Sequence, residues 1–177
     1  MIEWQHFPQS SRPPDHLLQV VRVFEACADR IGSLESRRGT GLKSDEVLSV
    51  VSDGLRRLGF AVERGKGKGE RIDVPVLLGR NGRVEQAFQA DAHNPVTGTV
   101  VEIEAGRAVA NNAYLKDLFE ACLMQDVQYL VIAVKSVYSP ANSRETRDFE
   151  TVCRSFVSMY ASRRLELPLS GILVIGY

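Results

Sequence analysis

The stretch that decides the fold is FQADAHNPVTGTVVEIEAGRA, residues 88–108. Polar and apolar side chains alternate on both sides of the turn NPVTG, residues 94–98, which is typical of two strands joined in a hairpin. Centring the hairpin on this turn puts Asp91 directly across from Glu102. The side chain of Glu104 lies on the same sheet face as Glu102, because successive side chains of a strand alternate between faces. Three carboxylates are therefore predicted to converge on one small patch.

This acidic patch needs a positive partner. Like charges directly opposite one another destabilise a sheet, and no Lys or Arg occurs from residue 91 to residue 106. The same register predicts Gln89, not a cation, opposite Glu104. Hard divalent ions such as Mg²⁺ or Mn²⁺ prefer carboxylate oxygens and take substrate phosphate as a further ligand. The patch favours a metal-dependent phosphoryl-transfer site, and the alternative is an ordinary half-solvated sheet with one polar face.

Apolar spacing and turn signals predict the other elements. Helices are expected over about 15–31, 44–58, 108–124 and 146–160, and strands over 60–63, 72–78, 83–93, 99–105, 129–135 and 172–175. Ser44 is the expected N-cap of the second helix, and Asn81-Gly82 predicts a type I′ hairpin turn. The helix over 108–124 is inferred from an apolar stripe that includes Leu115 and Phe119. An antiparallel meander followed by a parallel crossover implies an α/β fold with a mixed sheet flanked by helices.

Composition narrows the class of protein further. The 177 residues carry 22 Lys and Arg against 22 Asp and Glu, so the formal net charge of +0 argues against a passive polycation that coats nucleic acid. A hydrophobic content of 44% suits one domain over 1–177, with a core over about 44–135. The three cysteines lie far apart without metal-ligand spacing. No run of 18 apolar residues occurs, so we expect a cytoplasmic protein without a membrane role.

Residues 88–108, followed by NNAYLKDLFEACL and YLVIAVK, resemble the core of the PD-(D/E)XK nuclease superfamily and, within it, type II restriction endonucleases. That core is an αβββαβ unit, and the resemblance covers roughly residues 44–135. On it, Asp91 takes the place of the first acid and Glu102 that of the second. Glu104 stands where the motif usually has lysine, and Ala90 replaces the motif proline.

The resemblance implies a restriction-endonuclease-like mixed β-sheet and a Mg²⁺-dependent (or Mn²⁺-dependent) endonuclease that cuts double-stranded DNA. Asp91, Glu102 and the carbonyl of Ile103 would hold the metal ion. Glu104 would orient or deprotonate the attacking water or bind a second ion. Family habit also implies a homodimer, with the helix over 15–31 as the candidate dimer element. The alternative is a catalytically inactive member of the same fold that serves as a nucleic-acid-binding or assembly module.

Several further residues have both a functional and an ordinary interpretation. Candidate phosphate contacts are Lys66, Lys68 and Arg71 in the loop RGKGKGER, together with Arg107 and Asn111 after the acids. Solvated loops and helix capping explain the same residues without a ligand. Glu46 is a candidate extra acid for the metal site, or a first-turn complement to the helix dipole. Asp73 is a rival for the first acid, and Lys135 could replace the missing motif lysine from another strand.

Overall fold

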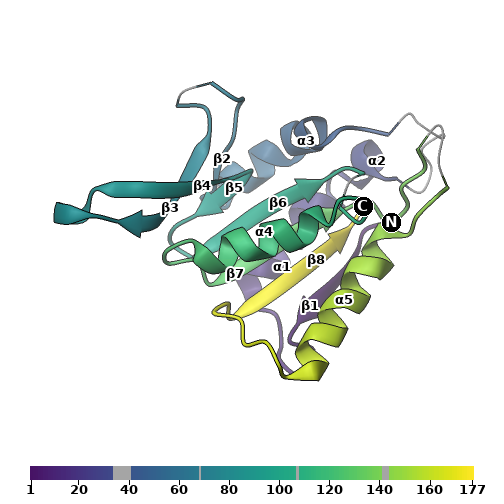
Figure 1. Ribbon diagram of the computed structural model, residues 1–177. Helices are drawn as coiled ribbons and strands as arrows, with labels where there is room; N and C mark the ends of the chain where they lie inside the picture. The colour runs from purple at the N-terminus through teal and green to yellow at the C-terminus, as the bar shows by residue number, and fades with distance from the viewer. Residues whose placement is uncertain (34–40, 68, 107, 141–143) are drawn as a thin grey trace.

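The computed structural model describes residues 1–33, 41–67, 69–106, 108–140 and 144–177 (Figure 1). Within this part of the chain, six strands form one mixed sheet in the order β1-β8-β7-β6-β5-β2, and β3 and β4 form a separate two-stranded sheet. The strands are β1 (Glu3–Phe7), β2 (Ala61–Val62), β3 (Ile72–Leu78), β4 (Val84–Ala90), β5 (Ala92–Asn94), β6 (Thr99–Glu104), β7 (Tyr129–Val134) and β8 (Gly171–Gly176). The helices are α1 (Asp15–Glu25), α2 (Ala28–Ile31), α3 (Ser44–Arg57), α4 (Ala113–Leu123) and α5 (Asp148–Ser162), with a 3₁₀ turn η1 (Arg80–Gly82).

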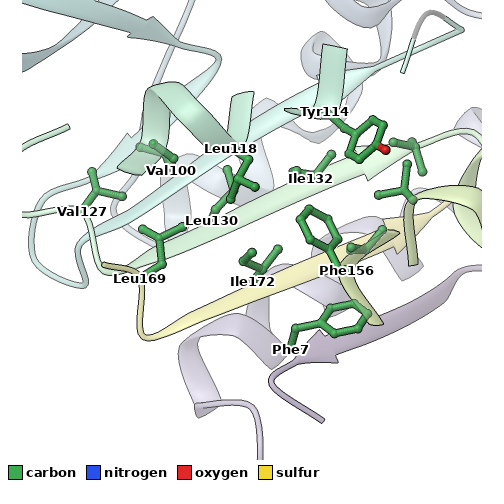
Figure 2. Packing of buried hydrophobic residues seen from close by; sticks show 14 of the residues in the cluster. Phe7, Val100, Tyr114, Leu118, Val127, Leu130, Ile132, Phe156, Leu169 and Ile172 are labelled. Atoms are coloured by element: carbon green, nitrogen blue, oxygen red, sulfur yellow. The ribbon is translucent and has the colours of Figure 1, made fainter. Parts of the chain in front are cut away.

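The main sheet separates two apolar cores. Strands β6, β7 and β8 run parallel, and α4 and α5 are the crossovers that return the chain between them. One face of the sheet packs on α4 and α5, where Val100, Leu130 and Ile172 lie beneath Leu118 and Phe156 (Figure 2). The other face packs on α1, α2 and α3. Because both faces are covered, β7 is apolar along its whole length, as its sequence predicts.

The hairpin between β5 and β6 has the predicted register. Ala92 pairs with Val101 and Asn94 with Thr99, so the turn is centred on Val96 and Thr97. The side chain of Asn94 holds this turn, because its Oδ1 accepts the amide N–H groups of Val96 (3.0 Å) and Thr97 (3.3 Å). Its Nδ2 donates to the carbonyl of Leu58 at 2.9 Å and so ties the turn to the end of α3.

Replacing Asn94 by Ala should therefore destabilise the protein. Asn94 is buried, and the change leaves two turn amides and one carbonyl without their partner. We expect a loss of about 1–3 kcal/mol in the free energy of unfolding, measured by urea denaturation. The exposed Asn111 offers a matched control, and an equal loss for Asn111→Ala would contradict the assignment.

Four local predictions need correction. The strand β1 was not predicted; it is an edge strand whose EWQHF sequence pairs antiparallel with β8. The predicted helix over 15–31 is two helices, α1 and α2. The expected strand over 83–93 is two strands in different sheets, β4 and β5, with Asp91 between them. The helix expected from residue 108 begins at Ala113.

The predicted turn at Asn81-Gly82 and the predicted N-cap at Ser44 have different outcomes. Asn81 and Gly82 both have the positive φ that the predicted type I′ turn needs, 59° and 73°, but the connection between β3 and β4 is the 3₁₀ turn η1 over Arg80–Gly82. Ser44 is the first residue of α3 rather than its N-cap, which is Lys43. The Ser44 hydroxyl instead accepts the amide N–H of Ala105 at 3.0 Å, which joins the start of α3 to the chain just after β6. No described helix is long and apolar enough to cross a membrane.

Candidate functional site

Two acids lie on the face of β6 that is turned towards α4. Glu102 and Glu104 are partly buried and alternate with Val101 and Ile103, which are buried in the opposite core. The strand is central in the sheet, between β5 and β7, so its backbone is held on both sides. Both carboxylates therefore project from a rigid element in which their spacing is fixed.

Asp91 joins this pair from the neighbouring strand. It lies between β4 and β5, and continuing the register of β5 with β6 puts it opposite Glu102. Its Oδ2 accepts the amide N–H of Ile103 at 2.8 Å, so the carboxylate is held against the backbone between the two glutamates. The main-chain carbonyl of Asp91 accepts the amide N–H of Glu63 at 2.8 Å. Asp91 is thus held by one hydrogen bond to its side chain and one to its main-chain carbonyl.

Gln89 does not face Glu104 as the hairpin register predicts. The chain changes sheets at Asp91, and Gln89 pairs with Asp73 in the small sheet of β3 and β4. That pairing also separates Asp73, the rival first acid, from the β6 acids, because Asp73 is exposed on the β3–β4 hairpin.

A fourth carboxylate, Asp117 on α4, was missed by the sequence reasoning. Its side chain is buried, and its Oδ2 has no hydrogen-bond partner among the described residues. The apolar stripe of α4 was expected to include Leu115 and Phe119, yet these side chains are 38% and 62% exposed. The buried face of α4 instead carries Tyr114 and Asp117 three residues apart. That spacing is the sequence signal that could have found Asp117.

Burial and mutual repulsion make the charged forms of these acids costly. Burial, with the charge of Glu63 and Glu104, raises the pKa of Asp91 to about 6, although the Ile103 amide and Lys66 oppose the shift. Burial, with the charge of Asp91 and Asp117, raises the pKa of Glu102 well above its usual range. The cluster therefore carries more carboxylates than it can ionise without a cation.

Asp117 shows the same effect. Burial, with the charge of Glu104 above all, raises the pKa of Asp117 to about 8, and Lys116 opposes the shift. Lys116 is itself paired with Glu120 at 3.1 Å, so its charge is shared. A buried acid with a raised pKa beside other acids makes the cluster a candidate functional site.

Of the residues predicted to contact phosphate, Lys66 lies near the acid cluster, and Arg71 and Asn111 are exposed in turns. Lys66 lies near the acids: it pairs with Glu63 at 3.2 Å and with Asp45 at 4.0 Å, and its charge favours the ionised form of Asp91. Arg71 is exposed in the turn before β3, and Asn111 is exposed in the turn before α4. Lys68 and Arg107 lie outside the described residues.

Glu46 and Lys135, the other two candidate site residues, make their contacts outside the acid cluster. The Glu46 carboxylate accepts the amide N–H of Lys43 at 2.7 Å, which caps the start of α3. Its charge acts on Lys135 and not on Asp91 or Glu102. Lys135 is buried after β7, with its Nζ 5.6 Å from the centre of the Tyr138 ring. Burial lowers the pKa of Lys135, while Asp148 and Glu46 raise it. The charges of both residues therefore act away from the acids of β6.

The donor atoms suit a hard divalent cation. Carboxylate oxygens from Asp91 and Glu102, with the carbonyl of Ile103 between the glutamates, are the ligand type that Mg²⁺ and Mn²⁺ prefer. Burial and neighbouring acids raise the pKa of Asp91 and Glu102, and the buried Oδ2 of Asp117 has no hydrogen-bond partner among the described residues. Among the described residues, no three His, Cys, Asp or Glu side chains are close enough together to hold a metal ion by themselves. Backbone oxygens or a substrate phosphate would have to complete the coordination.

The mixed six-stranded sheet flanked by helices on both faces is a restriction-endonuclease-like fold. The chain is similar to the restriction endonuclease BglII, whose crystal structure was determined in complex with a DNA 16-mer, with a TM-score of 0.55. The similarity covers 99% of this chain and 75% of that chain at 12% sequence identity, so it shows the fold. No protein-family model and no curated protein sequence matches the chain.

Proposed function

We propose that this protein is a metal-dependent DNA endonuclease that hydrolyses phosphodiester bonds. The observation that carries the proposal is the contact between Asp91 and the Ile103 amide, because it brings an acid from one strand beside the two acids of the next. Two adjacent strands of a restriction-endonuclease-like sheet thus present three carboxylates to one patch. The similarity to an enzyme crystallised with DNA supports DNA as the substrate.

In this proposal Asp91, Glu102 and the carbonyl of Ile103 hold Mg²⁺ or Mn²⁺. The bound ion supplies a Lewis acid for the scissile phosphate and lowers the pKa of a coordinated water. Glu104 orients or deprotonates the attacking water, or contributes to a second ion. Lys66, whose charge acts on Asp91, would neutralise a phosphate of the DNA backbone. Asp117 would line the site from the side of α4 and would lose its proton when a cation binds nearby.

A homodimer would allow two such sites to cut both strands of a symmetric sequence. The helix α1 is not well suited as the dimer element, because its apolar residues Leu17, Val20, Val21 and Phe24 are buried within the chain itself. Sedimentation of the free protein and of its DNA complex would measure the oligomeric state directly.

The test is a nicking assay on supercoiled plasmid. With Mg²⁺ or Mn²⁺ we expect nicked and linear products, and with EDTA we expect none. Single-stranded DNA and RNA of the same sequence, run alongside, define the substrate. DNA binding without cleavage in any metal would overturn the proposal in favour of a catalytically inactive nucleic-acid-binding module of the same fold.

A further inference from the structure

Two adjoining clefts lie beside α3, outside the acid cluster. The first, of about 300 Å³, runs between α3 and the chain over 63–66. The second, of about 380 Å³, lies between the end of α3 and the start of β3. Arg56 and Arg64 line both clefts, so the two spaces meet at a wall made by these arginines.

Asp91 does not line the first cleft, but two residues that line it act on Asp91. Glu63 lines it, and the Glu63 amide donates to the carbonyl of Asp91 at 2.8 Å. Lys66 also lines it, and its charge acts on Asp91. A chain lying in this cleft would therefore contact Glu63 and Lys66, whose charges both act on Asp91.

The charges of the cleft are not balanced. The lining of the first cleft carries three cations, Arg56, Arg64 and Lys66, against two acids, Asp45 and Glu63, and the second cleft adds Glu70. Lys66 lies within 4.0 Å of both Asp45 and Glu63. The side chain of Arg64 makes no hydrogen bond or ion pair with any residue that the structure describes. Its positive charge is left available to a ligand.

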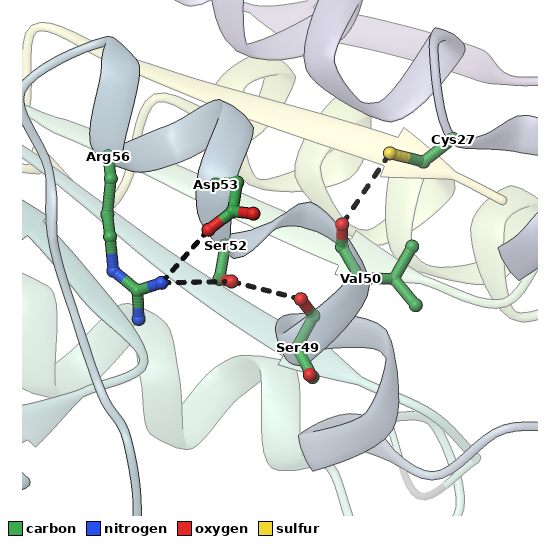
Figure 3. Close-up of polar contacts among 6 residues, drawn as sticks. All are labelled: Cys27, Ser49, Val50, Ser52, Asp53 and Arg56. Atoms are coloured by element: carbon green, nitrogen blue, oxygen red, sulfur yellow. Dashed lines mark hydrogen bonds and ion pairs between the residues drawn. The ribbon is translucent and has the colours of Figure 1, made fainter.

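Arg56 is held in place while keeping donors to spare. Its Nη1 donates to the Ser52 hydroxyl at 3.2 Å and to Asp53 at 3.3 Å (Figure 3). The Asp53 side chain is 84% exposed, so water screens this ion pair. A guanidinium has five N–H donors, and these contacts use one nitrogen, which leaves the rest of the fork for a ligand. Arg56 is thus positioned by its own helix rather than neutralised by it.

We propose that Arg56 and Arg64 form a phosphate-binding site that holds the DNA backbone a short distance from the scissile bond, and so guides one strand along α3 to Asp91. This inference rests on the proposed function for its ligand. Arginine suits the task because its planar fork matches two phosphate oxygens at once. Contacts of this kind fix the position of DNA without reading its sequence.

The neighbouring Arg57 offers a matched control. It follows Arg56 on α3, but it lines a different cleft of about 500 Å³ between α3 and α1. Figure 3 shows the opposite sides of α3, with Arg56 on one and the contact of Cys27 with the Val50 carbonyl on the other. The variants Arg56→Gln and Arg57→Gln therefore remove the same charge from adjacent positions that face different spaces.

The experiment measures binding of a labelled DNA duplex in EDTA, by fluorescence anisotropy over a range of salt concentrations. Arg56→Gln and Arg64→Gln should each weaken binding by roughly tenfold and reduce the slope of log K against log salt by about one. Arg57→Gln should change neither value appreciably. Arg56→Lys keeps the charge but not the fork, so it should restore the slope with only part of the affinity. Thermal unfolding of each variant shows whether the fold is retained.

The outcomes separate the two proposals. Wild-type binding by Arg56→Gln and Arg64→Gln, an equal loss in Arg57→Gln, or no DNA binding by the wild type would overturn the arginine site. If the arginine variants bind weakly as expected but the wild type cuts no DNA in any metal, the arginine site stands and the proposed nuclease function fails.

Discussion

Asp91→Asn should abolish divalent metal binding and lower the rate of DNA cleavage by on the order of 10³-fold or more. The substitution keeps the shape of the side chain, and its amide oxygen can still accept the Ile103 N–H, so the fold is preserved. It removes a negative charge that the proposed cation would need, next to Glu102. Calorimetric titration with Mn²⁺ measures the loss of binding independently of the loss of cleavage.

Asp73→Asn is the matched control for this prediction. Asp73 is the other aspartate in the strands before β6, and it is exposed on the β3–β4 hairpin. Its replacement should leave metal binding and cleavage at the wild-type level. Normal cutting by Asp91→Asn, or a loss of cutting in Asp73→Asn alone, would show that the first acid had been assigned to the wrong strand.

The stability of the metal-free protein should fall as the pH rises from about 4 to about 8. Burial raises the pKa of Asp91 to about 6 and that of Asp117 to about 8, so the folded protein binds more protons than the unfolded chain in this window. A carboxyl group with a raised pKa adds stability below its unfolded pKa, and that stability is lost as the pH passes its folded pKa. We expect a loss of several kcal/mol, measured by urea denaturation in EDTA.

Asp117→Asn tests the origin of this loss. It removes the buried charge, so it should stabilise the metal-free protein by several kcal/mol at pH 8 and have little effect at pH 4. The control is Asp126→Asn, because Asp126 is exposed and its positive φ of 60° suits Asn equally well. Mn²⁺ should raise the stability of the wild type at pH 8, since binding to the folded state alone stabilises it. A wild-type stability that stays level or rises between pH 4 and pH 8 would contradict the coupling among the acids.

The hairpin with its three acids could be predicted because its signals are local. The turn NPVTG fixes the register, and strict alternation puts Glu102 and Glu104 on one face. The change of sheet at Asp91 could not be predicted, because the alternation of polar and apolar residues runs through it without a break. Edge strand β1 was missed for a related reason: only one of its sides pairs with the sheet, so its sequence stays polar.

The remainder of the site depends on packing between distant segments. Asp117 belongs to the site only because α4 turns Tyr114 inwards and leaves Leu115 and Phe119 exposed. The helical spacing of the sequence is equally consistent with burial of the face that carries Leu115 and Phe119. Arg56 joins Arg64 only because the end of α3 packs beside the chain after β2. The spacing of residues along the sequence therefore predicts neither the place of Asp117 nor the proximity of Arg56 to Arg64.

The position of Asp91 between two sheets has a consequence for how this fold can diverge in evolution. The hairpin of β3 and β4 ends with the pair Ile72 and Ala90, and the hairpin of β5 and β6 starts with the pair Ala92 and Val101. One residue separates two independent registers. Insertions or deletions near the tip, at residues 79–83, can lengthen or shorten the reach of the β3–β4 hairpin while the alignment of Asp91 with β6 stays as it is. Lineages can therefore vary their contact surface in this region without rebuilding the chemistry beside it.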